Sequence, residues 1–260
     1  MKVYTEVKAK KFLGQHFLKD ETVASDTVDA LQLNERCKDV LEIGPGMGVL
    51  TKYLLKRSDV NLKVIELDRD SVTYLKTNFV ELKDRIIEGD FLKMNFDDHF
   101  KNQFAIIGNF PYNISTQILF RILENKDKIP FMVGMFQKEV AERIASKPGN
   151  RDYGILSVLL QPWFEMEYLF TVHEQQFIPP PRVKSAIIRV TRNERTELGI
   201  DEVYFKQLVK LAFNQRRKTL RNALRSVLPI DFSAIPFLDL RAEALSWEQF
   251  VLLGNKLKGK

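Results

Sequence analysis

The stretch "LEIGPGMGVLT", residues 41–51, decides the fold that this sequence predicts. Its first three residues read as the end of a buried strand, and glycines 44, 46 and 48 follow before a helical pattern begins. Glycine permits a tight strand-to-helix turn and lets a ligand approach the backbone where a Cβ would intrude. A dinucleotide site would require a small residue at position 49, which is valine, so NAD is disfavoured. A plain tight turn explains the glycines equally well, and the neighbouring strands must decide.

Outward from this stretch, short apolar runs alternate with longer helical patterns, which is typical of a parallel sheet with crossover helices. The expected strands span residues 38–43, 62–67, 85–89, 104–109 and 131–137. The expected helices include residues 48–57, 69–80, 115–125 and 138–146. Two later strands, 163–170 and 185–190, are expected to pair antiparallel at one edge. The predicted fold is therefore α/β, a Rossmann-like sheet with flanking helices.

The pattern changes after the charged stretch 191–199, beyond which it is helical to the end. We therefore predict two domains. Residues 1–194 form a catalytic α/β domain, and residues 195–260 form a small all-α domain.

Composition excludes several classes of protein. The chain has 260 residues, 45% of them hydrophobic, which suits a soluble protein with a sizeable core. Cys37 is the only cysteine, which excludes an internal disulfide and a cysteine-based zinc cluster, and the three histidines are scattered. No apolar run approaches the roughly 20 residues of a membrane helix. We expect a cytoplasmic protein without a metal. The net charge of +6 matters only if it is clustered.

Carboxylates follow the next two predicted strands. Glu66 ends the second, about 20 residues after Gly44, where a carboxylate can accept hydrogen bonds from both ribose hydroxyls. Asp90 ends the third and can accept from an adenine amine, although a turn or helix-cap role is commoner for such a residue. Ligands of open α/β sheets bind at the carboxyl ends of the strands. Gly44, Gly46, Glu66 and Asp90 together predict a nucleoside-bearing cofactor there.

The fourth strand ends in Asn-Phe-Pro-Tyr, residues 109–112. With the preceding features, this motif resembles the S-adenosylmethionine (SAM) methyltransferases that act on the exocyclic amine of adenine. More narrowly, seven ordered segments resemble the ribosomal RNA small-subunit adenine N6,N6-dimethyltransferase family: "KKFLGQHFL" (10–18), "EIGPGMGVLT" (42–51), "VIELDRD" (64–70), "GNFPYNIS" (108–115), "QKEVAERI" (137–144), "FIPPPRVKSAI" (177–187) and "FNQRRKTLRNAL" (213–224). Phe110 departs from the leucine common in bacterial members. The resemblance implies a class I SAM-methyltransferase sheet and SAM as methyl donor.

The resemblance also assigns catalytic roles. The lone pair of an adenine amine is delocalised into the ring, so acceptors aimed at its two N–H groups would favour a pyramidal, nucleophilic nitrogen. We expect the Asn109 side-chain oxygen and the Pro111 carbonyl to be these acceptors, the latter held by the fixed φ of proline. Tyr112 and Phe177 would stack on the two faces of a flipped adenine. Ordinary core packing is the alternative for both aromatic residues.

The N-terminal motif would cover the cofactor. By resemblance His16 and Leu18 contact SAM, and Gln15 and Phe17 shape a lid over it. A surface histidine is an equally good interpretation of His16 from sequence alone. Residues 1–19 hold five lysines and one glutamate, a local excess that suits RNA phosphates if the segment orders on binding.

The second predicted domain carries a basic run, "NQRRKTLRNALR" (214–225), without an acid. If it is one helix, positions 217, 221 and 225 form a single stripe, with Leu220 and Leu224 facing the core. A solvated helix face is the alternative, but five unbalanced cations favour contact with RNA phosphates. The predicted RNA-binding residues are Arg216, Arg217, Lys218, Arg221 and Arg225.

The sequence is compatible with three functions. The leading one, implied by the resemblance, is dimethylation of two adjacent adenines in the 3′-terminal hairpin of 16S (small-subunit) rRNA. The alternatives are a resistance-type methylase of large-subunit rRNA and a non-catalytic RNA-binding assembly or transcription factor. The segment 241–257 resembles the small-subunit branch, and the intact motif at 109–112 argues against a non-catalytic protein. We expect the immature small ribosomal subunit as partner, no DNA, no membrane, and a monomer.

Overall fold

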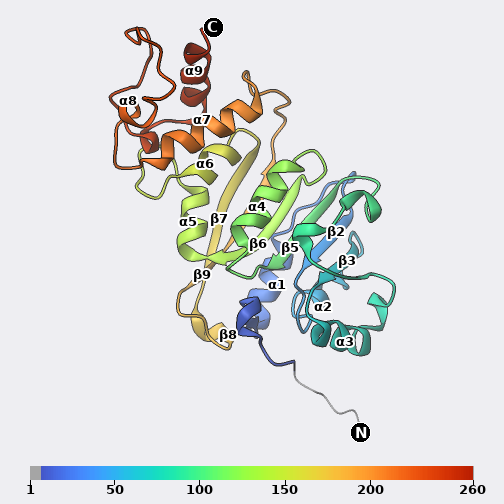
Figure 1. The fold of residues 1–260 in the computed structure, drawn as a ribbon. Helices are drawn as coiled ribbons and strands as arrows, with labels where there is room; N and C mark the ends of the chain where they lie inside the picture. The colour runs from blue at the N-terminus through green and yellow to red at the C-terminus, as the bar shows by residue number, and fades with distance from the viewer. Residues whose placement is uncertain (1–6, 260) are drawn as a thin grey trace. The chain divides into compact units, whose positions relative to one another are not determined.

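The computed structural model describes residues 7–259, and its centre is a seven-stranded sheet in the order β4-β3-β2-β5-β6-β9-β7 (Figure 1). The strands are β2 (Asp39–Ile43), β3 (Asn61–Glu66), β4 (Ile86–Glu88), β5 (Phe104–Asn109), β6 (Phe131–Gln137), β7 (Phe164–Val172) and β9 (Ser185–Arg192). The first five strands of this order run parallel, β9 runs antiparallel to β6, and β7 takes the edge beside β9. The predicted α/β sheet is confirmed.

The register of the parallel strands places the site. Ile43 lies opposite Ile65, and Glu66 lies opposite Glu88. Parallel strands aligned in this way end at one edge of the sheet, so the segments that follow them converge there. Val40, Val64 and Ile107 are fully buried, as expected for a sheet covered on both faces. The covering helices include α1 (Glu21–Asp29), α2 (Thr51–Leu54), α3 (Arg69–Asn78) and α4 (Ser115–Glu124).

The chain forms two compact units, which divide it differently from the predicted boundary near residue 195. The first holds residues up to Ala141 and Glu167–Arg192, and the second holds Glu142–Met166 and the chain from Asn193 onward. Residues 142–166 join the second unit because the buried α6 (Ile155–Leu160) packs against α7 (Glu202–Asn214). The helix α5 (Lys138–Ala145) and strand β7 begin in one unit and end in the other. Whether residues 195–260 form an independent domain stays a prediction.

The prediction of one helix over the basic run, residues 214–225, is wrong. Helix α7 ends at Asn214, and the next helix, α8 (Leu220–Ala223), has only four residues. The chain turns because the N–H groups of Leu220 and Arg221 donate to the carbonyls of Leu240 and Leu238, at 2.7 and 2.8 Å. The stripe expected from a continuous helix therefore does not form. Leu220 and Leu224 are fully buried, as predicted.

The second unit is otherwise helical. Helix α7 contacts α8 and the C-terminal α9 (Trp247–Leu257), and the rings of Phe213 and Phe250 stack at a centroid distance of 6.1 Å. Ser246 caps α9 by accepting a hydrogen bond from the Gln249 N–H.

A two-stranded sheet escaped prediction. Strand β1 (Phe17–Leu18) pairs antiparallel with β8 (Phe177–Ile178), and Leu18 lies opposite Phe177. Strands of two residues are too short to show the period of two by which strands are recognised. This pairing joins the N-terminal segment to the segment that precedes β9.

Phe110 is packed against a pair of glycines. Its ring is 1% exposed and contacts Phe136 edge-on, and Gly108 of β5 lies opposite Gly134 of β6. A Cβ at Gly134 would lie 2.2 Å from the Phe110 ring, and one at Gly108 would lie 2.6 Å from the Ile43 carbonyl oxygen. Neither position accepts a side chain without movement of its neighbours.

Gly134→Ala should lower the free energy of unfolding by about 1–3 kcal/mol, because the added methyl group overpacks the site. Combined with Phe110→Leu, whose side chain is shorter, the loss should be smaller than the sum of the two single losses by at least ~0.5 kcal/mol. Gly108→Ala is the comparison: its methyl group would lie 2.7 Å from the Phe110 ring but also 2.6 Å from the Ile43 carbonyl oxygen, and Phe110→Leu cannot relieve the second clash. Urea unfolding of the three single variants and of the two double variants with Phe110→Leu measures the effect, and strictly additive losses at Gly134 would contradict it.

Candidate active site

A cavity of about 210 Å³ lies at the carboxyl ends of β2, β3, β4 and β5. It is lined by the glycine turn, by residues that end or follow the strands, and by Leu13–Phe17 of the N-terminal segment. Among the predicted site residues, those lining it are Gln15, His16, Gly44, Gly46, Glu66, Asp90, Asn109, Pro111 and Tyr112. The structure thus brings together residues that lie far apart in the sequence.

The three glycines of the turn serve different purposes. Gly44, Gly46 and Gly48 all have positive φ, at 64°, 56° and 79°, where other residues are strained. A Cβ at Gly46 would lie 2.8 Å from the Phe17 ring, and one at Gly48 would lie 2.4 Å from Phe79. A Cβ at Gly44 would meet no atom within 4 Å. The last two glycines serve packing, whereas Gly44 leaves open a space that suits a ligand.

Glu66 connects the end of β3 to this turn. Its carboxylate, 6% exposed, accepts hydrogen bonds from the N–H groups of Gly46, at 3.1 Å, and Asp68, at 2.9 Å. Burial raises the pKa of Glu66 above its ordinary value, although these backbone donors oppose the shift. Each carboxylate oxygen keeps further acceptor capacity, so Glu66 can hold the turn and still accept from a diol.

Asp90 shows both roles considered for it. Its carboxylate accepts a hydrogen bond from the Leu92 N–H at 2.9 Å, capping the short helix Phe91–Lys93. It also lines the cavity, and its other oxygen lies 4.0 Å from the Lys93 ammonium. The capping bond fixes the carboxylate at the cavity edge, where an exocyclic amine could donate to it.

Asn109 is oriented by the N-terminal segment. Its Nδ2 donates to the His16 backbone carbonyl at 2.8 Å. Because a carbonyl only accepts, the amide nitrogen must face His16, which leaves Oδ1 as the acceptor available to a ligand. The Pro111 carbonyl accepts from the Ile114 N–H at 3.1 Å and retains a second lone pair. Both predicted acceptors are present, and Asn109 depends on a partner that the sequence did not suggest.

Tyr112 is fixed at both its hydroxyl and its ring. The hydroxyl lies 2.6 Å from the Ser185 Oγ, and burial raises the Tyr112 pKa. The ring stacks on His16 at a centroid distance of 5.6 Å, and His16 Nδ1 lies 2.8 Å from the Pro179 carbonyl oxygen. His16 thus covers one face of the Tyr112 ring, which leaves at most the other face for a base.

Phe177 and Leu18 are predicted site residues that do not line the main cavity. Phe177 is 1% exposed, belongs to the hydrophobic core, and does not line the cavity. Side chains alternate along a strand, so Phe177 points inward while its neighbour Ile178 is 57% exposed. In this conformation Phe177 cannot close the second face of an adenine. Leu18 is also a core residue, and it borders a second cavity of about 30 Å³ beside Gly44 and Asn109.

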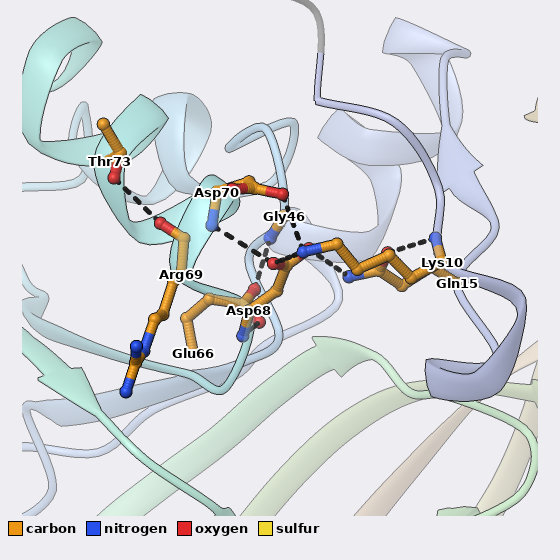
Figure 2. Close-up of polar contacts among 8 residues, drawn as sticks. All are labelled: Lys10, Gln15, Gly46, Glu66, Asp68, Arg69, Asp70 and Thr73. Carbon is orange, nitrogen blue, oxygen red and sulfur yellow. Dashed lines mark hydrogen bonds and ion pairs between the residues drawn. The ribbon is translucent and has the colours of Figure 1, made fainter.

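The sequence-based interpretation missed a polar network at the lid, shown in Figure 2. The Lys10 ammonium pairs with Asp68 and lies 2.7 Å from the Asp70 carboxylate. Gln15 accepts from the Lys10 N–H at 2.7 Å and donates to Asp68 at 3.1 Å. These bonds use both polar ends of Gln15, so its amide holds the lid. In the sequence, this network could have been inferred from the alternating acids of "VIELDRD", which begin at the end of the second predicted strand.

The basic run is partly neutralised by acids distant in sequence. Arg216 lies 3.6 Å from Glu243, and Arg221 lies 2.8 Å from Asp239. Arg217, Lys218 and Arg225 are exposed, and over residues 7–259 their side chains have no hydrogen bond or ion pair. Of the five cations that the sequence left without a nearby acid, three therefore have no acidic partner among the described residues.

The strand order, the glycine turn and the acidic and amide groups at the strand ends define a class I SAM-dependent methyltransferase. The chain belongs to the ribosomal RNA adenine dimethylase family, whose sequence model matches residues 6–254. SAM is the methyl donor that this family implies.

Curated relatives cover nearly the whole chain. Ribosomal RNA small subunit methyltransferase A of Cytophaga hutchinsonii is 57% identical over 98% of this chain and 99% of its own. The protein of the same name from Parabacteroides distasonis is 57% identical over 95% of this chain and 93% of its own.

Solved structures share the fold. A dimethyladenosine transferase from Plasmodium falciparum has a TM-score of 0.76 and 23% identity, over 94% of this chain and 98% of its own. The 23S rRNA methyltransferase ErmE has a TM-score of 0.71 and 25% identity, over 93% of this chain and 99% of its own.

Glu42 gives the site a pH-dependent stability. It is 1% exposed and accepts a hydrogen bond from Thr51 Oγ1 at 2.6 Å, and burial raises its pKa from 4.5 to about 8. Between these two values the folded chain keeps the proton that the unfolded chain releases. The Glu42 contribution to stability therefore falls as pH rises through this window.

Glu42→Gln should remove this dependence, because the amide can still accept from Thr51 and carries no charge. We expect the variant to exceed the parent protein in free energy of unfolding at pH 8 by more than ~1 kcal/mol, since one pKa unit corresponds to about 1.4 kcal/mol. The difference should shrink toward pH 5. Urea unfolding at pH 5, 6.5 and 8 measures it, and a difference that does not change with pH would contradict the assignment.

Proposed function

We propose that this chain transfers methyl groups from SAM to N6 of two adjacent adenines in the 3′-terminal hairpin of 16S rRNA. One observation carries the choice of substrate: the chain is 57% identical, over nearly its whole length, to a protein named ribosomal RNA small subunit methyltransferase A. The geometry around Asn109 and the glycine turn supports the reaction. Two methyl groups would be added to each adenine in successive steps.

The target nitrogen needs acceptors more than it needs a base. Asn109 Oδ1 and the Pro111 carbonyl would accept its two N–H groups and hold its lone pair out of conjugation with the ring. SAM, when bound, supplies an electrophilic methyl group on a sulfonium. The nitrogen lone pair forms the new N–C bond as the S–CH₃ bond breaks and its electron pair stays on sulfur. The methylated nitrogen, then cationic, is acidic enough to lose its proton to water.

Positioning supplies the remaining rate acceleration. The face of Tyr112 opposite His16 would stack on the flipped adenine, a contact worth about 1–3 kcal/mol, and the bond to Ser185 would keep that ring in place. In-line alignment of nitrogen and methyl can contribute about 7–11 kcal/mol. Glu66 would fix the ribose and Asp90 the adenine of SAM, while Gly44 lets the amino-acid part approach the backbone.

The alternatives have less support. ErmE, a 23S rRNA methyltransferase, is 25% identical to this chain, against 57% for the small-subunit relatives. A non-catalytic RNA-binding factor would have no use for Asn109 held with Oδ1 at the cavity. Both remain outcomes of the experiment below.

Further properties are part of the proposal. Within residues 7–259, no group of three or more His, Cys, Asp or Glu could hold a metal ion, and no helix is long and apolar enough to cross a membrane. We propose a monomer that acts in the cytoplasm on the immature small subunit, without a metal and without binding DNA.

Radiolabelled SAM should label isolated small subunits that lack the modification and should leave large subunits unlabelled, with the label mapping to adjacent adenines. Asn109→Ala should lower kcat by about 100-fold or more, because one of two acceptors is lost. Labelling of large subunits alone would overturn the substrate. Unchanged methyl transfer by the Asn109 variant would overturn the mechanism.

RNA contacts are proposed for two surfaces, one in each unit. In the first unit, Lys8 and Lys11 are exposed beside Phe12, which is 79% exposed, so cations flank an aromatic face that can stack on a base. Residues 1–6 of the basic N-terminal segment lie outside the described residues. In the second unit, the exposed cations are Arg217, Lys218 and Arg225.

Arg217→Ala with Lys218→Ala should weaken binding to the small subunit and should reduce its salt dependence by about one unit of slope per lost phosphate contact. Arg221→Ala, whose guanidinium is paired with Asp239, should have the smaller effect. Filter binding at several salt concentrations distinguishes the two. Equal losses of binding would show that the ion pair with Asp239 does not keep Arg221 from contacting RNA.

A further inference from the structure

The N-terminal segment Lys10–Phe17, here named the lid segment, forms one side of the cavity. Five of its residues, Leu13 to Phe17, line the cavity. Val7 before it and Leu18 after it are buried, but its short helix, Lys11–Leu13, buries no residue and exposes 79% of Phe12. Apolar packing therefore holds the two ends of the lid segment and does little for the part between them.

A polar clamp holds that middle part. The Lys10 ammonium bridges two carboxylates, that of Asp68, whose side chain is fully buried, and that of Asp70, which is 66% exposed. Asp68 also accepts from Gln15 Nε2 and from the Asp70 N–H, each at 3.1 Å (Figure 2). Burial by itself would raise the pKa of Asp68, but the hydrogen bonds from Lys10 and Gln15 outweigh it and hold the pKa below its ordinary value. Asp68 is thus an ionised, buried anchor for the lid segment.

The clamp is continuous with the cofactor side of the cavity. The Asp68 N–H donates to Glu66, and the same Glu66 carboxylate accepts from Gly46 of the glycine turn. Figure 2 shows Lys10, Asp68, Glu66 and Gly46 as one connected set. A displacement of the lid segment would therefore also shift Glu66 and the glycine turn, which face the ligand.

The other end of the lid segment reaches the catalytic side. The His16 carbonyl accepts from Asn109 Nδ2 at 2.8 Å, and this bond decides which end of the amide is free. A Cβ on Gly14 would lie 2.8 Å from Asn113 Oδ1, so the lid backbone runs close to the loop after Pro111. If the lid segment moved away, the Asn109 amide could rotate and present a donor where an acceptor is needed.

We propose that Lys10, Asp68 and Gln15 are positioning residues: their clamp holds the lid segment over the cavity, where it retains SAM and, through the His16 carbonyl, keeps the Asn109 oxygen aimed at the target amine. The inference rests on the proposed function, because it takes SAM as the ligand and Asn109 as the amine acceptor. One ion-pair network, away from the reacting atoms, thus controls both the affinity for SAM and the rate of methyl transfer.

Lys10→Met should raise the dissociation constant of SAM by about tenfold, because it removes a charged donor shared by two carboxylates. It should also lower kcat severalfold on small subunits that lack the modification. Lys10→Arg should restore both values, since a guanidinium can bridge two carboxylates. Titration calorimetry with SAM and a radiolabel assay measure the two effects.

Lys76→Met is the matched control. Lys76 pairs with Glu88, is half-exposed, and belongs to α3, the helix that Asp68 caps, but its side chain makes no hydrogen bond or ion pair with residues 10–17. This variant should leave SAM binding and kcat unchanged. If the loss in Lys10→Met were equalled by Lys76→Met, a general effect on α3 would explain it and the proposal would be overturned.

A double variant separates positioning from mere stability. In an Asn109→Ala background, Lys10→Met should still weaken SAM binding but should lower kcat no further, because the amide that it positions is absent. Additive losses in kcat would overturn the link through Asn109, and unchanged SAM binding in Lys10→Met would overturn the clamp. Asp68→Asn would alter a buried carboxylate that also caps α3, so Asp70→Asn, at an exposed position, supplies the second carboxylate test, with a smaller rise in the SAM dissociation constant expected.

Failure of the proposed function would look different. If the parent protein labelled no small subunits but Lys10→Met still weakened SAM binding relative to Lys76→Met, the substrate would be wrong and the clamp would stand. If the parent protein labelled small subunits and Lys10→Met matched it in both measurements, the clamp alone would be wrong.

Discussion

The parallel register of β2, β3, β4 and β5 is the constraint on which the site depends. Hydrogen bonding fixes Ile43 opposite Ile65 and Glu66 opposite Glu88, so the strands end together and the residues after them share one edge. A shift of one residue in any strand would exchange its two faces and turn the polar side chain that now ends it away from the cavity. The glycine turn, Glu66, Asp90 and Asn109 are a site because the sheet aligns them.

Much of this edge is held by carboxyl groups that accept hydrogen bonds from several different segments of the chain. Glu42 accepts from Thr51, Glu66 from the glycine turn, and Asp68 from the lid segment. Burying a charge or a carboxyl group is costly unless hydrogen bonds compensate, and each of these groups has such partners. The partners lie on different segments, so the carboxylates connect the turn, the strand ends and the lid segment. These bonds fix the arrangement of polar groups around the cavity.

The sheet was predictable because each strand carries its own signal. The runs of β5 and β6 are largely apolar, as strands buried on both faces are, and the predicted ends of β2, β5 and β6 differ from the observed ones by no more than a residue. The glycines and acids were predictable because they follow those runs directly. The pairing of β1 with β8 was not, because each strand has two residues. The break before α8 was not, because the carbonyls that cause it belong to Leu238 and Leu240.

The sequence by itself determined the α/β sheet, the family, and the polar residues that end the strands, since all of these are local patterns or ordered motifs. Tertiary structure decided what each side chain faces. It buried Phe177 against Leu18, paired Arg216 with Glu243 and Arg221 with Asp239, and turned the Asn109 nitrogen toward His16. These outcomes depend on contacts between residues far apart in the chain. No spacing or periodicity encodes such contacts, because they exist only once the strands have paired and the lid segment has closed onto Asp68.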